Sequence, residues 1–566
     1  MPHVSQGNSA VSQLNAASSD SRLKTDLALV FGVVLVLYLA TLSRMLNASH
    51  DSAGYINAID AGKLFHPHQL LFMCVSRLWI GLLRVFQPSM DSALAAASLN
   101  TVFGALTAAV VHLLLRKRLG LNRAVAFAGT AAVVFSYGVW LYSVCLEVDV
   151  APLFFMLCTL YLITGDATGK SFALAGVTHG FGMLFHQAQV LFGPVVLLAA
   201  ILKRRKAAQP VWRLLVLYVL AGTVVVAVPY LSVMLLYFKF RSPSDAYLWM
   251  TGYAHVQDYW YPVNLGTIKM IIVGLSRCYI GAQFTFAIPA MKAISGKETP
   301  YQMFIVRNMS TAAAWTYLLL SAAFVLLLAG SVLRRLRQIR AVWSRHRDLI
   351  LLAAAWFVAY AVFFVMWAPW NPEFWLPQSV CLWILFMALW AEPKAATSAK
   401  PAILIGALAV ILFIVNLFGG GIGLMRHRQN DYYYTSVRPL LDVMKPGDLL
   451  ITACRHNTPG SYLEHFGGAR VVGFFDLDVH DRPADEVMQQ IRRMMDQTLT
   501  AGNKVFVVQD AVEPTEECLN LYGEGTKQIA TLWADYRGGW EEVPAVTTVY
   551  VISPEEGIKG SRQEGN

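Results

Sequence analysis

Residues 26–46 read DLALVFGVVLVLYLATLSRML and are followed at once by NASHDSAGYINAIDAGKLFHPH at residues 47–68. The first stretch is apolar over about the length that crosses the hydrocarbon core of a bilayer. The second stretch places an acid, Asp51, close to a tyrosine, a lysine and two histidines. These two stretches predict a retained membrane span followed directly by a loop of ionisable residues. The rest of the chain is interpreted from this starting point.

Composition extends this interpretation to the whole chain. The 566 residues are 56% hydrophobic and only 14% charged, with a mean hydropathy of +0.49. Soluble domains carry about 25% charged residues. Repeated apolar runs near the length of a span predict a polytopic α-helical membrane protein. The net charge of +10 does not indicate nucleic-acid binding, because the basic residues form short clusters between apolar runs and are interpreted as determinants of topology.

The apolar runs predict a transmembrane domain at residues 25–426 with about eleven spans. A disordered cytoplasmic tail is expected at residues 1–24, which are rich in serine, asparagine and glutamine. With the N-terminus in the cytoplasm, basic clusters such as Arg116-Lys117-Arg118 fall inside, as the positive-inside rule requires. The acids and histidines of the loops then fall on the opposite, extracytoplasmic side.

Two outer regions carry most of the polar sequence between spans. Residues 47–90 form the first outer loop, and its apolar part is assigned to an interfacial helix because Arg77 and Arg84 would be costly in hydrocarbon. Residues 239–309 form a long outer region rich in tyrosine and tryptophan. Within it, residues 264–290 are expected to be re-entrant or interfacial, with a pair of crossings as the alternative.

The composition changes at residues 427–566. Strand-like runs alternate with helical runs there, which predicts a soluble α/β domain with a largely parallel sheet. The predicted strands are 449–454, 470–475, 504–509 and 547–552, and the predicted helices are 485–500 and 516–537. Odd span parity places this domain outside. No glycine-rich phosphate loop follows a strand, so a structural or acceptor-docking role is preferred to a nucleotide site.

Ionisable residues gather in the predicted outer loops. Each alone has an ordinary explanation, since an acid beyond a span is usually solvated and a histidine at a helix end often only caps it. Several such groups on one face of a bundle are typical of a functional site. The candidates are Asp51, Asp60, Lys63, His66, His68, Glu147, Asp149, His186 and Glu373.

The order of these motifs resembles the GT-C superfamily of polyprenyl-phosphate-sugar glycosyltransferases. It resembles most closely the DUF2723 family, which includes relatives of the protein O-mannosyltransferases. The matching residues are Asp51-Ser52, His66-Pro67, Glu147-Val148 and the run GFGMLFH at residues 180–186. His50, His68 and Asp149 stand where that family has glycine, a second proline and tyrosine. The resemblance covers about residues 25–205.

The resemblance implies a GT-C fold and an inverting transfer of sugar from a lipid-phosphate donor to a protein or glycolipid on the extracytoplasmic face. Asp51 is then the general base that takes the proton of the acceptor hydroxyl. Glu147 and Asp149, with Asp51, are a candidate site for Mg²⁺ or Mn²⁺. The candidate donor-phosphate ligands are Lys63, His66, His68, His186 and Arg307, and the candidate substrate or supporting residues are Tyr55, Asp60 and Glu373.

Two other functions remain open at this stage. A polysaccharide polymerase or ligase also uses lipid-linked sugars, but its large outer loop is organised differently. A transporter or flippase should show paired repeats or ionisable groups in broken helices at mid-bilayer. Most acids in this sequence lie at span ends, which favours an enzyme over a transporter. The expected location is a bacterial inner membrane or an ER-like membrane.

Overall fold

The computed structural model describes two compact units, each built mainly from helices or from a sheet with helices. The described residues are 5–49, 51–204, 210–252, 260–288, 300–391, 399–453, 458–477, 482–516, 518–519, 525–535, 541–543 and 548–553. The membrane unit comprises Met1–Arg44 and Gly62–Arg426, and the α/β unit comprises Met45–Ala61 and His427–Asn566. His50, from the polar stretch at 47–68, lies outside the described residues.

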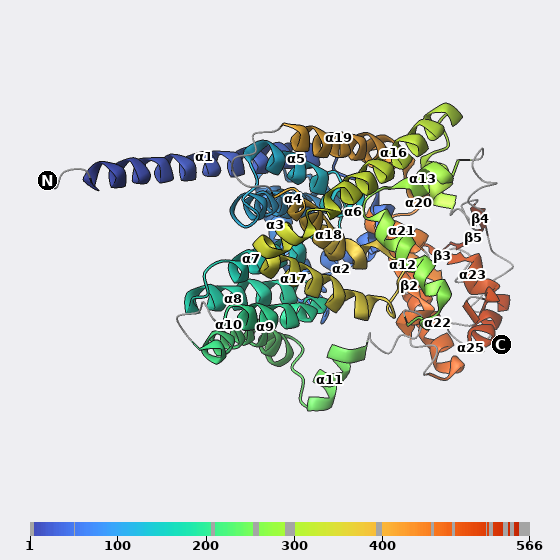
Figure 1. The fold of residues 1–566 in the computed structure, drawn as a ribbon. Helices are drawn as coiled ribbons and strands as arrows, with labels where there is room; N and C mark the ends of the chain where they lie inside the picture. The colour runs from blue at the N-terminus through green and yellow to red at the C-terminus, as the bar shows by residue number, and fades with distance from the viewer. Residues whose placement is uncertain are drawn as a thin grey trace, which may run out of the picture. The chain divides into compact units, whose positions relative to one another are not determined.

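The membrane unit is helical (Figure 1). Its α-helices are α1 (Ser5–Ala40), α3 (Phe72–Phe86), α4 (Ser92–Lys117), α5 (Arg123–Val134), α6 (Tyr137–Val144), α7 (Val150–Thr164), α8 (Gly169–Phe185), α9 (Gly193–Leu202), α10 (Val211–Ser232), α11 (Pro243–Thr251), α12 (Leu265–Arg277), α13 (Ala282–Phe286), α15 (Pro300–Ile305), α16 (Thr311–Leu336), α17 (Ile339–Phe364), α18 (Leu376–Ala388) and α19 (Lys400–Ile414). Helix α1 begins at Ser5, inside the segment for which the sequence predicted a disordered tail.

In the described part of the chain, five segments are long and apolar enough to cross a bilayer: Ser21–Ala40, Ser92–Lys117, Val211–Tyr237, Thr311–Phe364 and Lys400–Gly419. The fourth holds α16 and α17 together, and its 54 residues would measure about 81 Å as one helix, more than twice the hydrocarbon thickness. The bent pair of α5 and α6 adds a sixth candidate. The figure of eleven spans stays a prediction.

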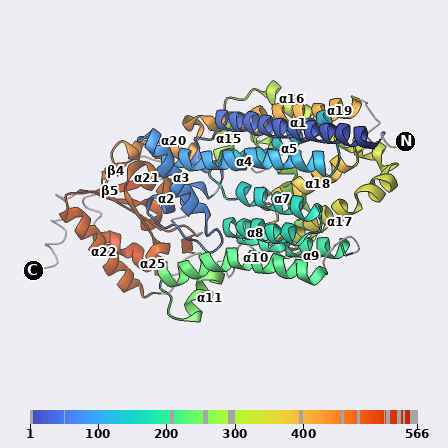
Figure 2. The same ribbon diagram turned by 90° about the vertical axis from the view of Figure 1, so that its left-hand side faces the viewer.

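Close helix packing organises the membrane unit. Helix α1 runs alongside α4 (Figure 2), and α8 packs between α7 and α10. Glycines permit the second contact, because a Cβ atom at Gly176 of α8 would collide with the Tyr218 carbonyl oxygen of α10. Gly222 of α10 faces Gly176 from the other side. Small residues that let two backbones approach are the usual means of packing helices in lipid.

The apolar segment that holds α5 and α6 is not one straight helix. Helices α5 and α6 meet at a bend of 65°. Asn416 lies in a short π-helix, η8 (Val415–Gly419), and donates from its amide nitrogen to the Phe135 carbonyl at 2.7 Å and to the Tyr279 carbonyl at 2.8 Å. Its amide oxygen accepts from Gly281 N at 3.0 Å. This fully buried side chain thus joins the bend to two other segments.

The α/β unit contains a five-stranded sheet in the order β2-β1-β3-β5-β4. Its elements are α2 (Ser52–Asp60), α20 (Tyr432–Leu441), β1 (Leu449–Thr452), α21 (Thr458–Gly467), β2 (Arg470–Gly473), α22 (Ala484–Thr500), β3 (Val505–Val508), α23 (Gln509–Val512), α25 (Gly525–Ala530), β4 (Glu541–Val543) and β5 (Val549–Ile552). Strand β1 pairs in parallel with β2 and β3, whereas β5 pairs antiparallel with β3 and β4. The expected parallel arrangement therefore holds for three strands.

Helix α22 covers the sheet with one apolar face. Val487, Ile491 and Met495 recur every four residues, are buried and join the core formed by β1, β3 and β5. That spacing places the three side chains on one side of a helix. The fold class predicted from the sequence, a polytopic helical membrane protein with a C-terminal α/β domain, is confirmed.

The first outer loop is divided between the two units. The sequence assigned all of residues 47–90 to the transmembrane domain, but Met45–Ala61 belongs to the α/β unit. Leu46 N donates to the Asp431 carboxylate at 3.1 Å, and α2 packs against α21. The second part of the loop contains α3, which agrees in position with the predicted interfacial helix.

Candidate active site

Three of the predicted histidines lie together in the membrane unit. The loop before α3 lies against the end of α8. Gln187 N donates to the His68 carbonyl at 2.7 Å, and Leu71 N donates to the Leu184 carbonyl at 3.0 Å. The rings of His66 and His68 are 5.3 Å apart, and both act electrostatically on His186. We call His66, His68 and His186 the histidine cluster.

Burial keeps the histidine cluster neutral near pH 7. It lowers the pKa of His66 to about 4, with a further contribution from His68, and it lowers the pKa of His68 as well. Burial, followed by repulsion from His68 and His66, lowers the pKa of His186 to about 4. The neutral cluster therefore differs in charge from the other two candidate phosphate ligands, Lys63 and Arg307.

The hydrogen bonds of two of these rings fix their tautomers. His66 Nδ1 accepts from His68 N at 3.3 Å, and His186 Nδ1 accepts from Ala188 N at 3.2 Å. Because Nδ1 is the acceptor in both rings, the proton of each neutral imidazole lies on Nε2. Each ring is thus set up as an N–H donor, which is the form that binds an anionic oxygen without adding a net charge.

Three predicted acids form a second group, which we call the carboxylate cluster. Glu147, Asp149 and Glu373 all act electrostatically on Tyr142 and on Cys145, at the end of α6. Glu147 is buried, whereas Asp149 and Glu373 are half-buried. The structure therefore brings together acids from two loops that are more than 200 residues apart in sequence.

The backbone around the carboxylate cluster is held by specific bonds. Asn100 of α4 donates from its amide nitrogen to the carbonyls of Cys145 and Glu147. Glu373 lies in the short 3₁₀ helix η7 (Pro372–Trp375), where Asn371 Oδ1 accepts from Glu373 N at 3.3 Å. Asp149 directly precedes α7, so the positive end of that helix favours its negative charge.

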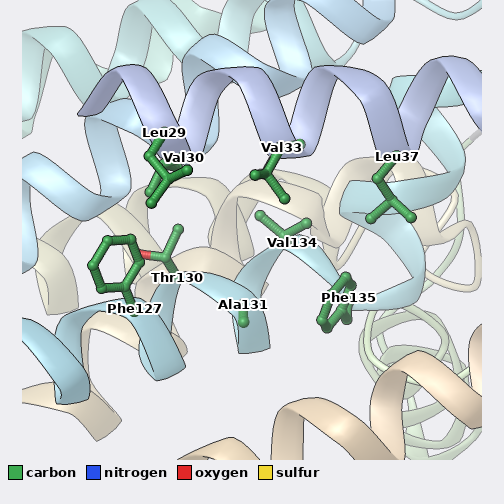
Figure 3. A pocket seen from close by; sticks show the side chains of 10 residues that line it. Leu29, Val30, Val33, Leu37, Phe127, Thr130, Ala131, Val134 and Phe135 are labelled. Carbon is green, nitrogen blue, oxygen red and sulfur yellow. The ribbon is translucent and has the colours of Figure 1, made fainter. Parts of the chain in front are cut away.

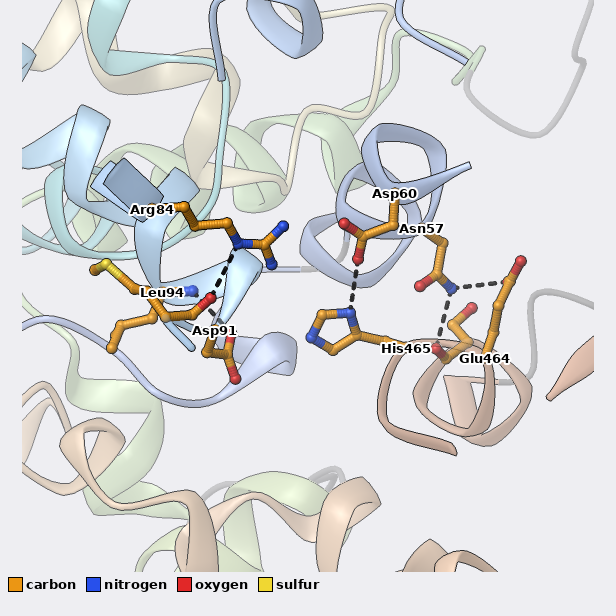
Figure 4. A network of polar contacts seen from close by, with 9 residues as sticks. Asn57, Asp60, Arg84, Asp91, Leu94, Glu464 and His465 are labelled. Carbon is orange, nitrogen blue, oxygen red and sulfur yellow. Dashed lines mark hydrogen bonds and ion pairs between the residues drawn. The ribbon is translucent and has the colours of Figure 1, made fainter. Parts of the chain in front are cut away.

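The predicted base lies in the α/β unit. Asp51 immediately precedes α2 and is exposed, and Tyr55 donates its hydroxyl to Asp51 Oδ2 at 3.2 Å. Farther along α2, Asp60 pairs with His465 at 3.3 Å (Figure 4). Asn57 donates to Glu464 Oε2 at 2.9 Å and to the Ser461 carbonyl at 3.0 Å. Asp60 therefore serves the attachment of α2 to α21.

The two predicted cations, Lys63 and Arg307, are both exposed and lie in the membrane unit. The Arg307 guanidinium lies 4.0 Å from the centroid of the Phe304 ring and donates to the Phe304 carbonyl at 2.6 Å. These contacts hold the side chain against its own helix end.

The candidate metal site has two of its three proposed ligands, Glu147 and Asp149, in the carboxylate cluster. Within the described residues, no group of three or more histidine, cysteine, aspartate or glutamate side chains is arranged to hold a metal ion. A role for Mg²⁺ or Mn²⁺ stays a prediction.

Several residues near these clusters were not singled out from the sequence. Tyr142 lies in an apolar run that gives no functional signal, and Asn100 is one polar residue within a long helix. Tyr230 of α10 donates its hydroxyl to the Pro67 carbonyl between the two histidines of the first loop. Of these residues, only Asn100 could have been identified from the sequence. An asparagine within a predicted span needs a hydrogen-bonding partner, because lipid provides none.

The fold of this chain is similar to that of a protein of known structure. The structure is similar along most of its length to that of ArnT from Cupriavidus metallidurans bound to undecaprenyl phosphate, with a TM-score of 0.53 and 13% identity over 93% of this chain and 97% of that one. The apo structure of the same protein gives a TM-score of 0.55 and 11% identity over the same shares. The protein shares the fold of ArnT, and this is the GT-C fold that the sequence resemblance predicted. It is a multi-pass membrane protein.

A second comparison covers part of the chain. The family model described as dolichyl-phosphate-mannose-protein mannosyltransferase matches residues 78–231. That segment includes Glu147, Asp149 and His186 but begins after Asp51. No curated protein sequence gives a significant match. The closer resemblance to the DUF2723 family stays a prediction.

Proposed function

We propose that this protein is a membrane glycosyltransferase that moves a sugar from a polyprenyl-phosphate donor to a protein or glycolipid acceptor on the extracytoplasmic face. The observation that carries the proposal is the GT-C fold over 93% of the chain. The histidine and carboxylate clusters of the membrane unit add polar groups of the kinds that this chemistry needs. A lipid-phosphate donor is supported by the undecaprenyl phosphate bound to ArnT.

The histidine cluster suits the phosphate of the donor. In the proposed reaction, His66 and His186 donate their Nε2–H groups to phosphate oxygens, and an approaching anion favours protonation of the rings. Negative charge that develops on the departing phosphate is then stabilised by these fixed N–H donors. Lys63 and Arg307 complete the proposed set of donor ligands.

Asp51 is the proposed general base. In one inverting displacement, the acceptor oxygen bonds to the anomeric carbon while the bond from that carbon to the phosphate oxygen breaks. The acceptor proton passes to the Asp51 carboxylate, and the lipid phosphate leaves with the electron pair of the broken bond. Tyr55 orients the carboxylate through its bond to Oδ2.

The proposal is tested by transfer of mannose from synthetic polyprenyl-phosphate mannose, with the purified full chain and a membrane extract that supplies acceptors. Asp51→Asn should lower the rate at least about 100-fold, in line with the usual contribution of a general base. Asp485→Asn is the matched control, because Asp485 is an exposed acid of the same unit on α22. An Asp51→Asn protein that keeps full activity would remove Asp51 from the mechanism.

The metal proposal has its own test. Treatment with EDTA should abolish transfer, and Mg²⁺ or Mn²⁺ should restore it, if Glu147 and Asp149 bind a catalytic ion. Unchanged transfer after EDTA would assign these carboxylates to substrate binding or to positioning instead.

A further inference from the structure

An apolar groove separates α1 from α5 in the membrane unit. Its volume is about 260 Å³, and Figure 3 shows Leu29 and Val30 opposite Phe127 at one end and Leu37 opposite Phe135 at the other. The side chains of Leu29 and Val33 are 50% and 59% exposed. In a multi-pass membrane protein, side chains exposed along a span face lipid, so hydrocarbon is the medium that meets this groove.

The one polar residue in the lining does not make the groove polar. Thr130 donates its hydroxyl to the Ala126 carbonyl at 2.8 Å, and the same oxygen lies 3.2 Å from His112 Nδ1. The hydroxyl proton is thus used within the protein, and Thr130 is only 3% exposed. A cavity with such a lining does not hold water and accepts an apolar guest.

The length of the groove fits one lipid chain. From Leu29 to Leu37 the helix axis advances about 12 Å at the standard rise per residue. One leaflet contributes about 15 Å of hydrocarbon, half of the usual total. The groove therefore matches an acyl chain that stays within a single leaflet, rather than a long polyprenyl chain.

A basic group lies where the groove begins. Arg123 is at the start of α5, and its guanidinium lies 5.5 Å from the centroid of the Phe127 ring, which lines the groove. Its side chain is 62% exposed although it pairs with buried Asp26 at 2.8 Å. The start of the apolar segment of α1 (Ser21–Ala40) and the end of α4 add basic residues, namely Arg22, Lys24, Arg116, Lys117 and Arg118. These six basic residues outnumber the acids that act on them, Asp26 and Asp166, and this excess of positive charge is complementary to an anionic headgroup.

We propose that the groove binds one acyl chain of an anionic phospholipid whose phosphate lies at Arg123. The lipid covers the exposed apolar side of α1 and holds that helix to α5. This site does not depend on the proposed glycosyltransferase activity, because its lining residues are separate from the histidine and carboxylate clusters.

The test is native mass spectrometry of the full chain released from nanodiscs that contain equal amounts of phosphatidylglycerol and phosphatidylcholine. The wild-type protein should retain one phosphatidylglycerol. Ala131→Phe and the more exposed Val33→Phe should each abolish this retention by filling the groove. Val224→Phe is the matched control, because Val224 is an exposed apolar residue of α10 outside the groove.

The headgroup contact is tested by two variants with opposite expected effects. Arg123→Gln should lower the preference for phosphatidylglycerol about tenfold or more, as expected for a hydrogen bond between charged groups. Asp26→Asn should strengthen retention, because Arg123 then loses its competing partner. A merely structural ion pair would make both variants weaken retention, which would overturn the proposal. Arg213→Gln, on α10, is the control for loss of a surface charge.

Two further outcomes would also overturn it. Equal retention of both phospholipids by every variant would identify the lipid as an ordinary annular one. Retention of undecaprenyl phosphate in preference to phosphatidylglycerol, when both are present in the nanodisc, would assign the groove to the donor lipid.

Discussion

Replacing Asn416 by alanine should destabilise the membrane unit more than a typical polar substitution. The side chain makes three hydrogen bonds, to the Phe135 carbonyl, the Tyr279 carbonyl and Gly281 N, and it is fully buried. Hydrogen bonds between membrane helices contribute about 0.6 kcal/mol each on average, so the three sum to about 2 kcal/mol. Gly281 N loses its partner in a buried site, which adds up to about 2 kcal/mol.

The expected loss in unfolding free energy is therefore about 2–4 kcal/mol, measured by titrating the protein in dodecylmaltoside micelles with sodium dodecyl sulfate. Asn122→Ala is the matched control. Its side chain makes one capping bond to Val125 N at 2.9 Å, and its removal should cost about 1 kcal/mol. Equal losses for the two variants would refute the view that Asn416 joins three segments.

Two more predictions follow from close packing and from titration. Gly176→Ala should destabilise the contact of α8 with α10 by about 1–3 kcal/mol, because the new Cβ meets the Tyr218 carbonyl. Gly32→Ala is the control and should be nearly neutral, because nothing lies within 4 Å of a Cβ atom built there. The same detergent titration measures the unfolding free energy of both variants. Folding lowers the pKa of His66 and His186 to about 4 from 6.5. Their stabilising contribution is complete above pH 6.5 and is lost as the pH falls towards 4. The difference in unfolding free energy between pH 7 and pH 5 should shrink in His186→Gln, and an unchanged difference would contradict the burial argument.

The sequence predicted the parts of the fold that depend on local patterns. Strand β1 was expected at 449–454 and lies at Leu449–Thr452, and helix α22 was expected at 485–500 and lies at Ala484–Thr500. Periodicity and chain composition determine such elements. The bend between α5 and α6 could not be predicted in this way, because Asn416, which bonds to Phe135 at the bend, is 281 residues away.

The same distinction applies to the candidate site. Spacing and sidedness predicted that histidines and acids would gather, and His66, His68 and His186 do lie together. Their charge state depends on burial, which no local pattern reports. The assignment of Asp51 to the α/β unit likewise depends on contacts of α2 with residues near the other end of the chain, such as Glu464.

The attachment of α2 also has a consequence in time. Asn57 bonds to Ser461 and Glu464, which are made 404 and 407 residues later. At ribosomal rates of about 5–20 residues per second, that interval is about 20–80 s. During synthesis, the helix that begins next to Asp51 must wait for almost the whole membrane unit to be inserted before its partners exist. Synthesis of α21 is therefore the event that secures the first part of this outer loop, and a ribosome that stops before α21 leaves α2 unattached.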